Sequence, residues 1–464
     1  MKNFCLALLL SLGFGLTSCS DKSDPDNTAF PSNTVTIPER GVSRFETPQD
    51  FDPLLAQLGP ARYALLGEAS HGTSEFYTQR AALTKRLIEE KGFTLIGVEG
   101  DWPELYELNR YVKGANNGAS AVAVLQRLKR WPTWLWANHE VADFAEWLRT
   151  YNRTQPAERQ VGFYGLDLYS LWPSLESIRT DFADADPATR NAVSAALECL
   201  GAYRSEEEYG RATTTGTNCA AAVAQVLAAV QNRRQALPAG HEGAFNAEQN
   251  ALVAVNAERY YRTAARSYSA SWNVRDQHMV ETINRLMSFY GPNAKIAVWE
   301  HNTHVGDARH TDMAASGLVN VGQLVREQHA AEGVYVVGMG TYAGTVIAAP
   351  YWGGPVTSMT VPAAKAGSWE AILHAQRPGN SLLLLDTWRG SSNLTQRRGN
   401  RAIGVQYDPS NETGNYVPTD LPHRYDAFLF IEQTTALRPL PTPSGGRQLP
   451  PQVRASEMLR AENF

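Results

Sequence analysis

Short apolar runs recur along the chain, and stretches with helical periodicity separate them. Continuous apolar runs of strand length are typical of strands that are buried on both faces of a sheet. Alternation of such strands with amphipathic helices is the pattern of a mostly parallel sheet. The sequence therefore predicts an α/β fold, with strands at residues 63–66, 94–98, 161–166, 295–299, 334–338, 382–385 and 427–431.

Most of the predicted strands end in a carboxylate. Glu68 follows the first run, Glu99 the second and Asp167 the third, and the fourth run is followed by Glu300 and His301. In open parallel sheets, ligands bind outside the carboxyl ends of the strands. Because parallel strands bring these ends to one edge, we expect a single polar site at that edge.

Between residues 174 and 289 the apolar runs stop and helical periodicity dominates. We interpret this segment as a helical insertion that forms a lid or wall over the polar edge. The insertion interrupts one α/β domain, which we expect at residues 45–438. A Pro-rich C-terminal tail, residues 439–464, follows the domain.

The N-terminus has the pattern of a secretion signal. Lys2 precedes an apolar stretch, residues 4–16, that is shorter than the about 20 residues needed to span a bilayer. The stretch ends in Leu16-Thr17-Ser18-Cys19, which resembles a bacterial lipobox. We therefore expect a lipoprotein signal peptide at residues 1–19 and a flexible tether at residues 20–44. Lipid on Cys19 would be the only membrane contact and would place the protein in the cell envelope, periplasmic or tethered to the outer membrane. Cleavage by an ordinary signal peptidase is the alternative.

Cys199 and Cys219 are the cysteines that remain beyond the signal segment. A compartment outside the cytoplasm permits a disulfide. A bridge between the two residues and a pair of buried thiols are both compatible with the sequence. Neither cysteine belongs to a C-x-x-C or Cys/His signature, so we do not expect a catalytic cysteine.

The charge balance argues against one class of partner. The chain has 42 Lys+Arg and 47 Asp+Glu, a formal net charge of -5, and no long run of one sign. Nucleic-acid-binding proteins normally carry a basic patch or stripe. We therefore expect a small-molecule partner and no nucleic acid.

Histidines are the main candidate catalytic residues in this sequence. The motifs G-x-S-x-G, H-E-x-x-H and G-x-x-x-x-G-K-[ST] are absent. His71 stands in a loop with flanking glycines just after the first predicted strand, where a neighbouring carboxylate could fix its tautomer. Such a histidine can deprotonate water near neutral pH. Arg80, or the pair His301 and His304, could then stabilise an oxyanion.

Several motifs resemble the erythromycin esterase family, in the order in which that family has them. The resemblance covers roughly residues 45 to 438. Its motifs are Leu66-Gly67-Glu68-Ala69-Ser70-His71-Gly72, Arg80, Gly97-Val98-Glu99-Gly100-Asp101-Trp102, Gly165-Leu166-Asp167-Leu168-Tyr169-Ser170, Trp272-Asn273-Val274-Arg275-Asp276-Gln277-His278-Met279, Trp299-Glu300-His301-Asn302-Thr303-His304-Val305 and Ile431-Glu432-Gln433-Thr434-Thr435-Ala436.

The resemblance implies a three-layer α/β/α fold and hydrolysis of the lactone ring of macrolides such as erythromycin. It implies that His71 activates a water molecule without a covalent intermediate, and that no cofactor is needed. The catalytic cleft would contain Glu68, Arg80, Glu99, His301 and His304, and we expect Asp167, Arg275 and Glu300 to contact substrate. Glu300 departs from the family pattern, which often has a small residue there.

Two other functions would use some of the same residues. His301 and His304, with Glu68 or Asp167, could hold zinc in a metal-dependent hydrolase of another ester. Alternatively, the protein could be a lipoprotein that binds haem or another small ligand, with His71, His278 or Tyr169 as the axial ligand. The sequence leaves a divalent metal at the polar edge open.

Overall fold

The computed structural model describes residues 35–442, apart from 116–118, 183–185, 217 and 239. The predicted signal peptide, lipidation of Cys19, the first part of the predicted tether and residues 443–464 lie outside the described residues. Among the described helices, none is both long and apolar enough to cross a membrane.

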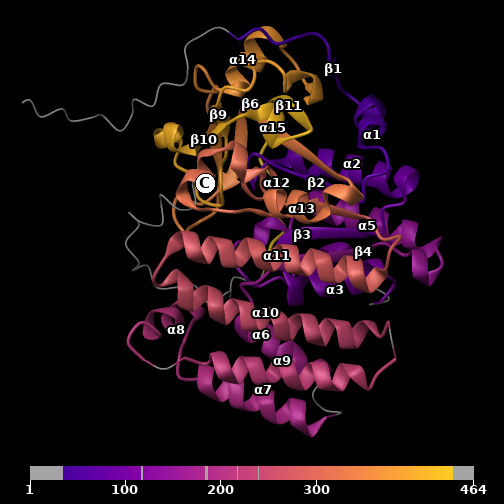
Figure 1. The fold of residues 1–464 in the computed structure, drawn as a ribbon, viewed down its shortest axis with the longest axis vertical. Coiled ribbons are helices and arrows are strands. Elements are labelled where there is room, and N and C mark those ends of the chain that lie inside the picture. The colour runs from indigo at the N-terminus through magenta and orange to yellow at the C-terminus, as the bar shows by residue number, and fades with distance from the viewer. Residues whose placement is uncertain (1–34, 116–118, 183–185, 217, 239, 443–464) are drawn as a thin grey trace, which may run out of the picture.

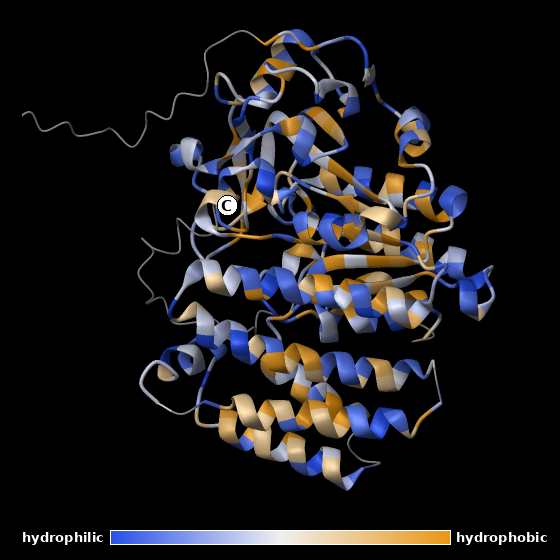
Figure 2. Ribbon diagram, in the orientation of Figure 1, coloured by the Kyte–Doolittle hydropathy of each residue, from blue (hydrophilic) through white to orange (hydrophobic). Residues whose placement is uncertain are grey.

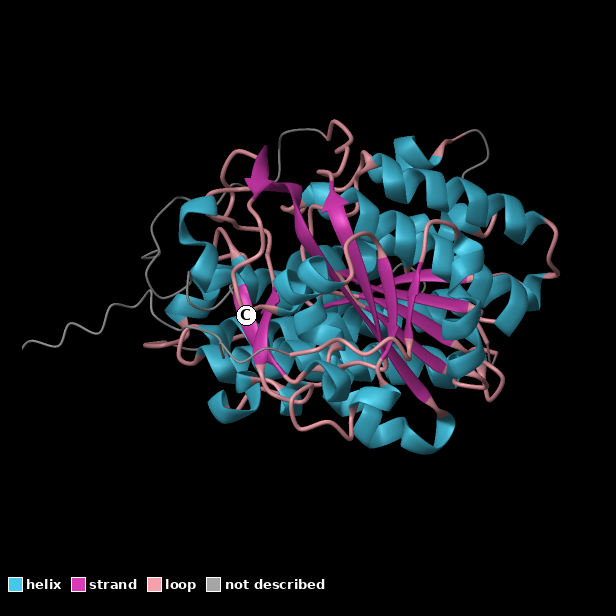
Figure 3. Ribbon diagram, turned by 90° about the horizontal axis from the view of Figure 1, so that it is seen from above, coloured by secondary structure: helices cyan, strands magenta, loops and turns pink. Residues whose placement is uncertain are grey.

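A nine-stranded sheet forms the centre of the fold (Figures 1 and 3). The strands β11, β6, β2, β5, β3 and β4 lie side by side in that order and are all parallel. Beyond β11, β8 is antiparallel to its neighbours β11 and β1. The predicted α/β fold with a mostly parallel sheet is confirmed. The strands are β1 (Val42–Arg44), β2 (Tyr63–Leu66), β3 (Leu95–Asp101), β4 (Gly162–Asp167), β5 (Ile296–Trp299), β6 (Val334–Ala348), β7 (Thr357–Val361), which pairs with β6, β8 (Ser381–Leu384) and β11 (Ala427–Thr434). A separate pair is formed by β9 (Arg398–Arg401) and β10 (Tyr416–Thr419).

Helices cover both faces of the sheet, which explains why the strands are apolar throughout (Figure 2). Ala64 and Leu66 of β2 belong to the hydrophobic core on one face, and Tyr63 and Leu65 belong to the core on the other face. The first face is covered by α1 (Asp52–Leu58), α2 (Ser74–Lys91) and α5 (His139–Arg153), and the second by α11 (Tyr268–Tyr290), α13 (Val321–His329) and α14 (Trp369–Gln376).

The described residues between β4 and β5 form helices only. They are α6 (Leu171–Asp181), α7 (Pro187–Leu200), α8 (Glu206–Ala212), α9 (Ala220–Gln235), α10 (Glu242–Ala264) and α11. α11 lies against the sheet, and α10, α9 and α7 are stacked progressively farther from it (Figure 1). A hydrophobic core of their own joins α6 to α10, and a disulfide links Cys199 in α7 to Cys219 at the start of α9.

The ends of the described chain pack more closely than the sequence suggested. Val35 and Ile37 are buried, and β1 pairs with β8, so residues 35–44 are part of the fold and not of a flexible tether. Leu440 is also buried and its backbone N–H donates to the carbonyl of Ala137. The predicted boundaries at 44 and 438 were wrong here because the apolar residues beyond them are buried against the domain.

Candidate active site

The parallel strands deliver polar side chains to one cleft at their carboxyl ends. Leu66 of β2 and Val98 of β3 both lie opposite Trp299 of β5, so the residues that follow these three positions lie at the same edge of the sheet. The cleft has an empty volume of about 1210 Å³, including its part open to solvent. The predicted site residues that line it are His71, Glu99, Asp167, Arg275, His301 and His304.

His71 is oriented by a carboxylate and an arginine behind it. Its Nδ1 lies 2.9 Å from Glu68 Oε1, and Arg80 Nη2 donates to Glu68 Oε2 at 2.5 Å. The Glu68 carboxylate accepts a hydrogen bond from Nδ1–H of His71. The Nε2 of a neutral His71 therefore has no proton and can accept one. Burial lowers the pKa of His71, but the carboxylates of Glu99 and Glu68 outweigh this effect and raise it above the ordinary value.

Arg80 does not reach the cleft. Its side chain is fully buried in α2, with the guanidinium over the rings of Tyr77 and Trp299. The expectations that Arg80 stabilises an oxyanion and that Glu68 lines the cleft are therefore wrong. Both residues are linked to the cleft through the hydrogen bond between Glu68 and His71.

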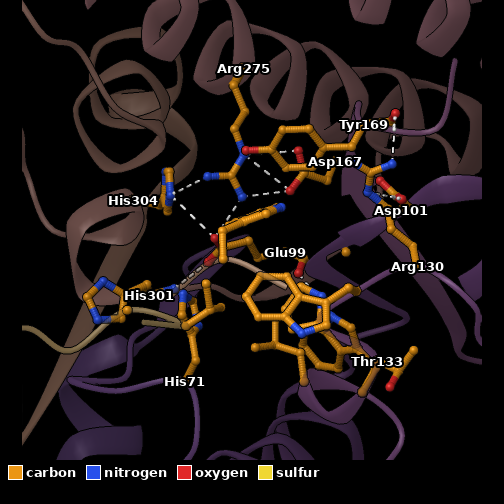
Figure 4. A pocket seen from close by; sticks show the side chains of 18 of the residues that line it. His71, Glu99, Asp101, Arg130, Thr133, Asp167, Tyr169, Arg275, His301 and His304 are labelled. Atoms are coloured by element: carbon orange, nitrogen blue, oxygen red, sulfur yellow. Dashed lines mark hydrogen bonds and ion pairs between the residues drawn. The ribbon is translucent and has the colours of Figure 1, made fainter. Parts of the chain in front are cut away.

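Arg275 joins three of the strand ends (Figure 4). Its Nη2 donates to Asp167 Oδ2 at 2.6 Å and to Glu99 Oε1 at 2.8 Å, and its Nε donates to Asp167 Oδ1 at 3.0 Å. The third nitrogen, Nη1, lies 3.0 Å from His304 Nε2. An arginine from α11 thus neutralises two buried carboxylates and uses all three nitrogens in doing so.

Glu99 is ionised in this setting. Burial raises its pKa, but the charges of His304, His71 and Arg275 and a hydrogen bond from the backbone N–H of His301 hold it well below the ordinary value. A fixed negative charge therefore faces His71 and stabilises its protonated form.

His304 is fixed on every side. Its Nδ1 lies 2.9 Å from Asp276 Oδ1, and its Nε2 accepts a hydrogen bond from Arg275 Nη1. Its ring stacks on Trp272 with the ring centroids 4.6 Å apart. Asp276, the residue that follows Arg275 in α11, thus contacts His304. This packing makes His304 a rigid part of the wall between α11 and α12 (Asn302–Val305).

His301 contributes a neutral ring to the lining of the cleft. Its Nδ1 accepts the backbone N–H of Thr303 at 3.3 Å, so the proton of the neutral ring is on Nε2. Burial, together with the nearby His71, lowers the pKa of His301 well below the ordinary value and keeps the ring neutral. Nε2 has no hydrogen-bond partner of normal geometry among the described residues, but the backbone of Ala69 is close enough to raise the pKa of the ring in part. The rings of His301 and His71 lie 4.9 Å apart.

Glu300 lies behind the cleft instead of lining it. It is 1% exposed, and neither carboxyl oxygen has a hydrogen-bond partner among the described residues. Burial, Glu99 and Asp276 raise the pKa of Glu300 well above the ordinary value. The expected substrate contact is wrong, because β5 turns Trp299 toward α2 and the next side chain toward the opposite face of the sheet.

Replacing Glu300 by glutamine is expected to stabilise the protein progressively as the pH rises. The folded protein keeps the Glu300 proton, whereas the unfolded chain releases it above the ordinary pKa of 4.5. Above pH 4.5, the free energy of unfolding of the parent therefore falls by up to about 1.4 kcal/mol for each pH unit. The decrease ends at the pKa that Glu300 has in the folded protein. Urea unfolding at about pH 5 and about pH 8 should show a difference between variant and parent that grows with pH. Glu176→Gln, at an exposed position, is the control; an equal difference at both pH values would contradict a neutral Glu300.

Aromatic and charged side chains that the sequence did not assign complete the cleft. Asp101 at the end of β3 lies 3.3 Å from Arg130, whose guanidinium also stacks on Tyr169. The three tryptophans in residues 131–136 could have suggested an aromatic cleft wall, but such a segment is equally typical of a packed core. The aromatic walls consist of Trp131, Trp136, Tyr169, Tyr260, Tyr268, Trp272 and Trp352. From the helical insertion, only α10 and α11 contribute lining residues among those described.

The polar edge does not form a compact set of metal ligands in the described part of the chain. His301 is turned toward Thr303, and His304 is held between Asp276 and Arg275. Among the described residues, a group of three potential ligands with atoms all within 4.8 Å of one another occurs elsewhere, at His310, Asp420 and His423.

Comparison with known sequences identifies relatives. The family model described as "Erythromycin esterase" matches residues 88–434, so that Glu68, His71 and Arg80 lie just before the matched segment. "Erythromycin esterase type II" of Escherichia coli is 29% identical over 141 residues, which are 30% of this chain. The matched segment spans 32% of the length of that relative.

Solved structures share the fold at lower identity. A succinoglycan biosynthesis protein has a TM-score of 0.68 and 22% identity, and a Bacillus cereus protein has 0.70 and 19%. For both, the match covers 86% of this chain and 96% of the other. A mutant of an erythromycin esterase in its open conformation matches with a TM-score of 0.59 and 18% identity, over 83% of this chain and 94% of that one.

Proposed function

The chain belongs to the erythromycin esterase family, and from this premise we propose that it hydrolyses carboxylic esters, with the lactone ring of macrolides as substrate. Family membership supports a hydrolase of the esterase class. The observation that carries the mechanism is the hydrogen-bonded chain from Arg80 through Glu68 to His71, which ends in an imidazole open to the cleft.

In the proposed first step, His71 acts on water. Nε2 of the neutral ring takes a proton from a water molecule, and the hydroxide attacks the ester carbonyl. The imidazolium that forms is stabilised by Glu68 at 2.9 Å and by the ionised Glu99. Collapse of the tetrahedral intermediate breaks the bond between the acyl carbon and the alkoxy oxygen, and His71 returns the proton to the leaving alkoxide.

His301 is suited to hold the oxyanion. Its neutral ring has an Nε2–H with no partner of normal geometry among the described residues, and it lies beside the His71 ring, with the centroids 4.9 Å apart. A donor that is already fixed when charge develops on the carbonyl oxygen stabilises the transition state with little reorganisation. Arg275 has a different role, because its nitrogens are occupied: it keeps Glu99, Asp167 and His304 in place.

The lining of the cleft is compatible with a mostly apolar ester. The aromatic walls would contact an aliphatic macrolactone ring, while polar groups are concentrated at the floor around His71.

The test is incubation of the protein, expressed without residues 1–19, with macrolides of different ring size. Mass spectrometry should detect the gain of one water, with opening of the lactone. A simple aryl ester is assayed in parallel. Hydrolysis of the aryl ester without opening of any macrolide would reject the macrolide assignment and retain the esterase. A folded protein that hydrolyses neither would reject both.

A further inference from the structure

A cluster of two histidines and one aspartate lies outside the cleft lining. His423 Nδ1 is 2.8 Å from Asp420 Oδ2, and His310 Nδ1 is 3.7 Å from the same oxygen. The two imidazole rings lie nearly parallel, with centroids 5.1 Å apart. The distance from His310 is too long for a hydrogen bond, yet each of the three residues offers one ligand atom, and these atoms all lie within 4.8 Å of one another.

The backbone holds the three residues in place independently of their side chains. His310 ends the short helix η5 (Ala308–His310), Asp420 immediately precedes α15 (Leu421–Arg424), and His423 lies one turn later. The backbone N–H of Asp420 donates to the carbonyl of His310 at 3.0 Å, and Thr311 pairs with Thr419. The site is therefore built from two segments that are already tied together.

We propose that His310, Asp420 and His423 bind a zinc ion. Imidazole nitrogen and carboxylate oxygen are ordinary zinc ligands, and three protein ligands plus water complete a tetrahedral shell. The distances of 2.8 and 3.7 Å lie on either side of the about 3.3 Å that separates two ligands of one tetrahedral zinc ion. The side chains of His310 and His423 are about one-third exposed, at 32% and 34%, so the ion can enter from solvent.

Arginines lie near this position: Arg326 Nη1 donates to the carbonyl of His423 at 2.9 Å, and Arg389 Nε donates to that of Pro422 at 2.8 Å. Arg309, the neighbour of His310, is turned away: its Nε and Nη2 donate to Asp307, and its Nη1 lies 3.4 Å from Glu327. Asp420 thus faces the two imidazoles, which are neutral ligands when deprotonated.

The zinc ion would stabilise the segment that follows the cleft histidines. η5 comes directly after α12, and the backbone N–H of Asp307 donates to the carbonyl of Arg424 in α15. Arg424 in turn donates to the carbonyl of Asn302 at 2.9 Å. A metal between η5 and α15 reinforces this connection without contacting substrate. The inference does not depend on the proposed hydrolysis.

The full chain, stripped with a chelator and dialysed, is titrated with zinc sulfate against a chromophoric zinc indicator, and bound metal is counted by mass spectrometry. One zinc per chain is expected. His310→Ala and Asp420→Asn should weaken binding by at least about 100-fold, because losing a direct ligand should cost no less than losing the outer support of one. At a free zinc concentration about 100 times the dissociation constant, the melting temperature of the parent should rise by about 3 °C.

Two variants separate this site from others. His374→Ala removes a histidine of similar exposure that pairs with Glu432 and stacks on Tyr342. His71→Asn changes the cleft, and both variants should retain one zinc. Circular dichroism verifies that each variant is folded. Absence of micromolar zinc binding by the parent, or zinc retained by His310→Ala and Asp420→Asn, would overturn the proposal. Zinc lost in His71→Asn but kept in His310→Ala would place the ion in the cleft and overturn it equally.

Discussion

Replacing His71 by asparagine should lower kcat for ester hydrolysis by about 10³-fold, within the range that a positioned general base contributes. The asparagine amide can still donate to Glu68, so the hydrogen-bonded chain to Arg80 is kept. What is lost is the Nε2 that takes the proton from water. Steady-state kinetics of parent and variant on the same substrate measure the effect, and KM should change much less than kcat.

The parent should also show an acid limb in its pH profile, because only neutral His71 can accept a proton. Since Glu99 and Glu68 raise the pKa of His71, kcat/KM should rise with pH through a pKa above 6.5 and then level off. His329→Asn is the matched control: His329 Nδ1 lies 2.7 Å from Glu332, also three residues away, but outside the cleft lining. A His71→Asn variant as active as the His329→Asn control would exclude His71 as the base.

Replacing Arg275 by methionine should both destabilise the fold and impair catalysis. The variant leaves Glu99 and Asp167 buried without their cation, which costs about 3–5 kcal/mol in free energy of unfolding. It also releases His304, and a displacement of this kind lowers kcat by about 100-fold. Urea unfolding and steady-state kinetics check the two effects separately.

A compensated variant distinguishes charge from packing. Combining Arg275→Met with Glu99→Gln and Asp167→Asn removes the unpaired charges, so most of the lost stability should return while activity stays low. Arg179→Met is the control, because Arg179 pairs with Glu176 at the exposed surface of α6, where such a pair contributes about 1 kcal/mol or less. No recovery of stability in the combined variant would mean that Arg275 acts mainly through packing.

The strand ends could be read from the sequence because the signal is local. A continuous apolar run predicts a strand that is buried on both faces of the sheet. The carboxylate that follows it, Glu99 or Asp167, predicts that the chain reaches the edge of the hydrophobic core there. The same logic placed His71, one loop beyond β2, at the correct edge.

Side-chain direction could not be read in the same way. Glu300 follows the apolar run of β5 just as Glu99 follows the apolar run of β3, but Glu300 lies behind the cleft and Glu99 lines it. Arg80 is on α2 at a spacing that suits contact with the cleft, yet it is buried under Glu68. Both outcomes depend on which neighbouring helix meets the side chain, and that is a property of packing.

By itself, the sequence determined the α/β class, the edge of the sheet that carries the chemistry and the resemblance to one family, since strand periodicity and motif order are contained in contiguous residues. Only the tertiary structure determined which side chains contact one another in these sites. Arg275 reaches Asp167 and Glu99 from a helix far along the chain, and His310 meets Asp420 and His423 across more than 100 residues. Such contacts arise only when separate elements bury their apolar faces against each other, because that packing sets the distances at which charges pair and ligands converge.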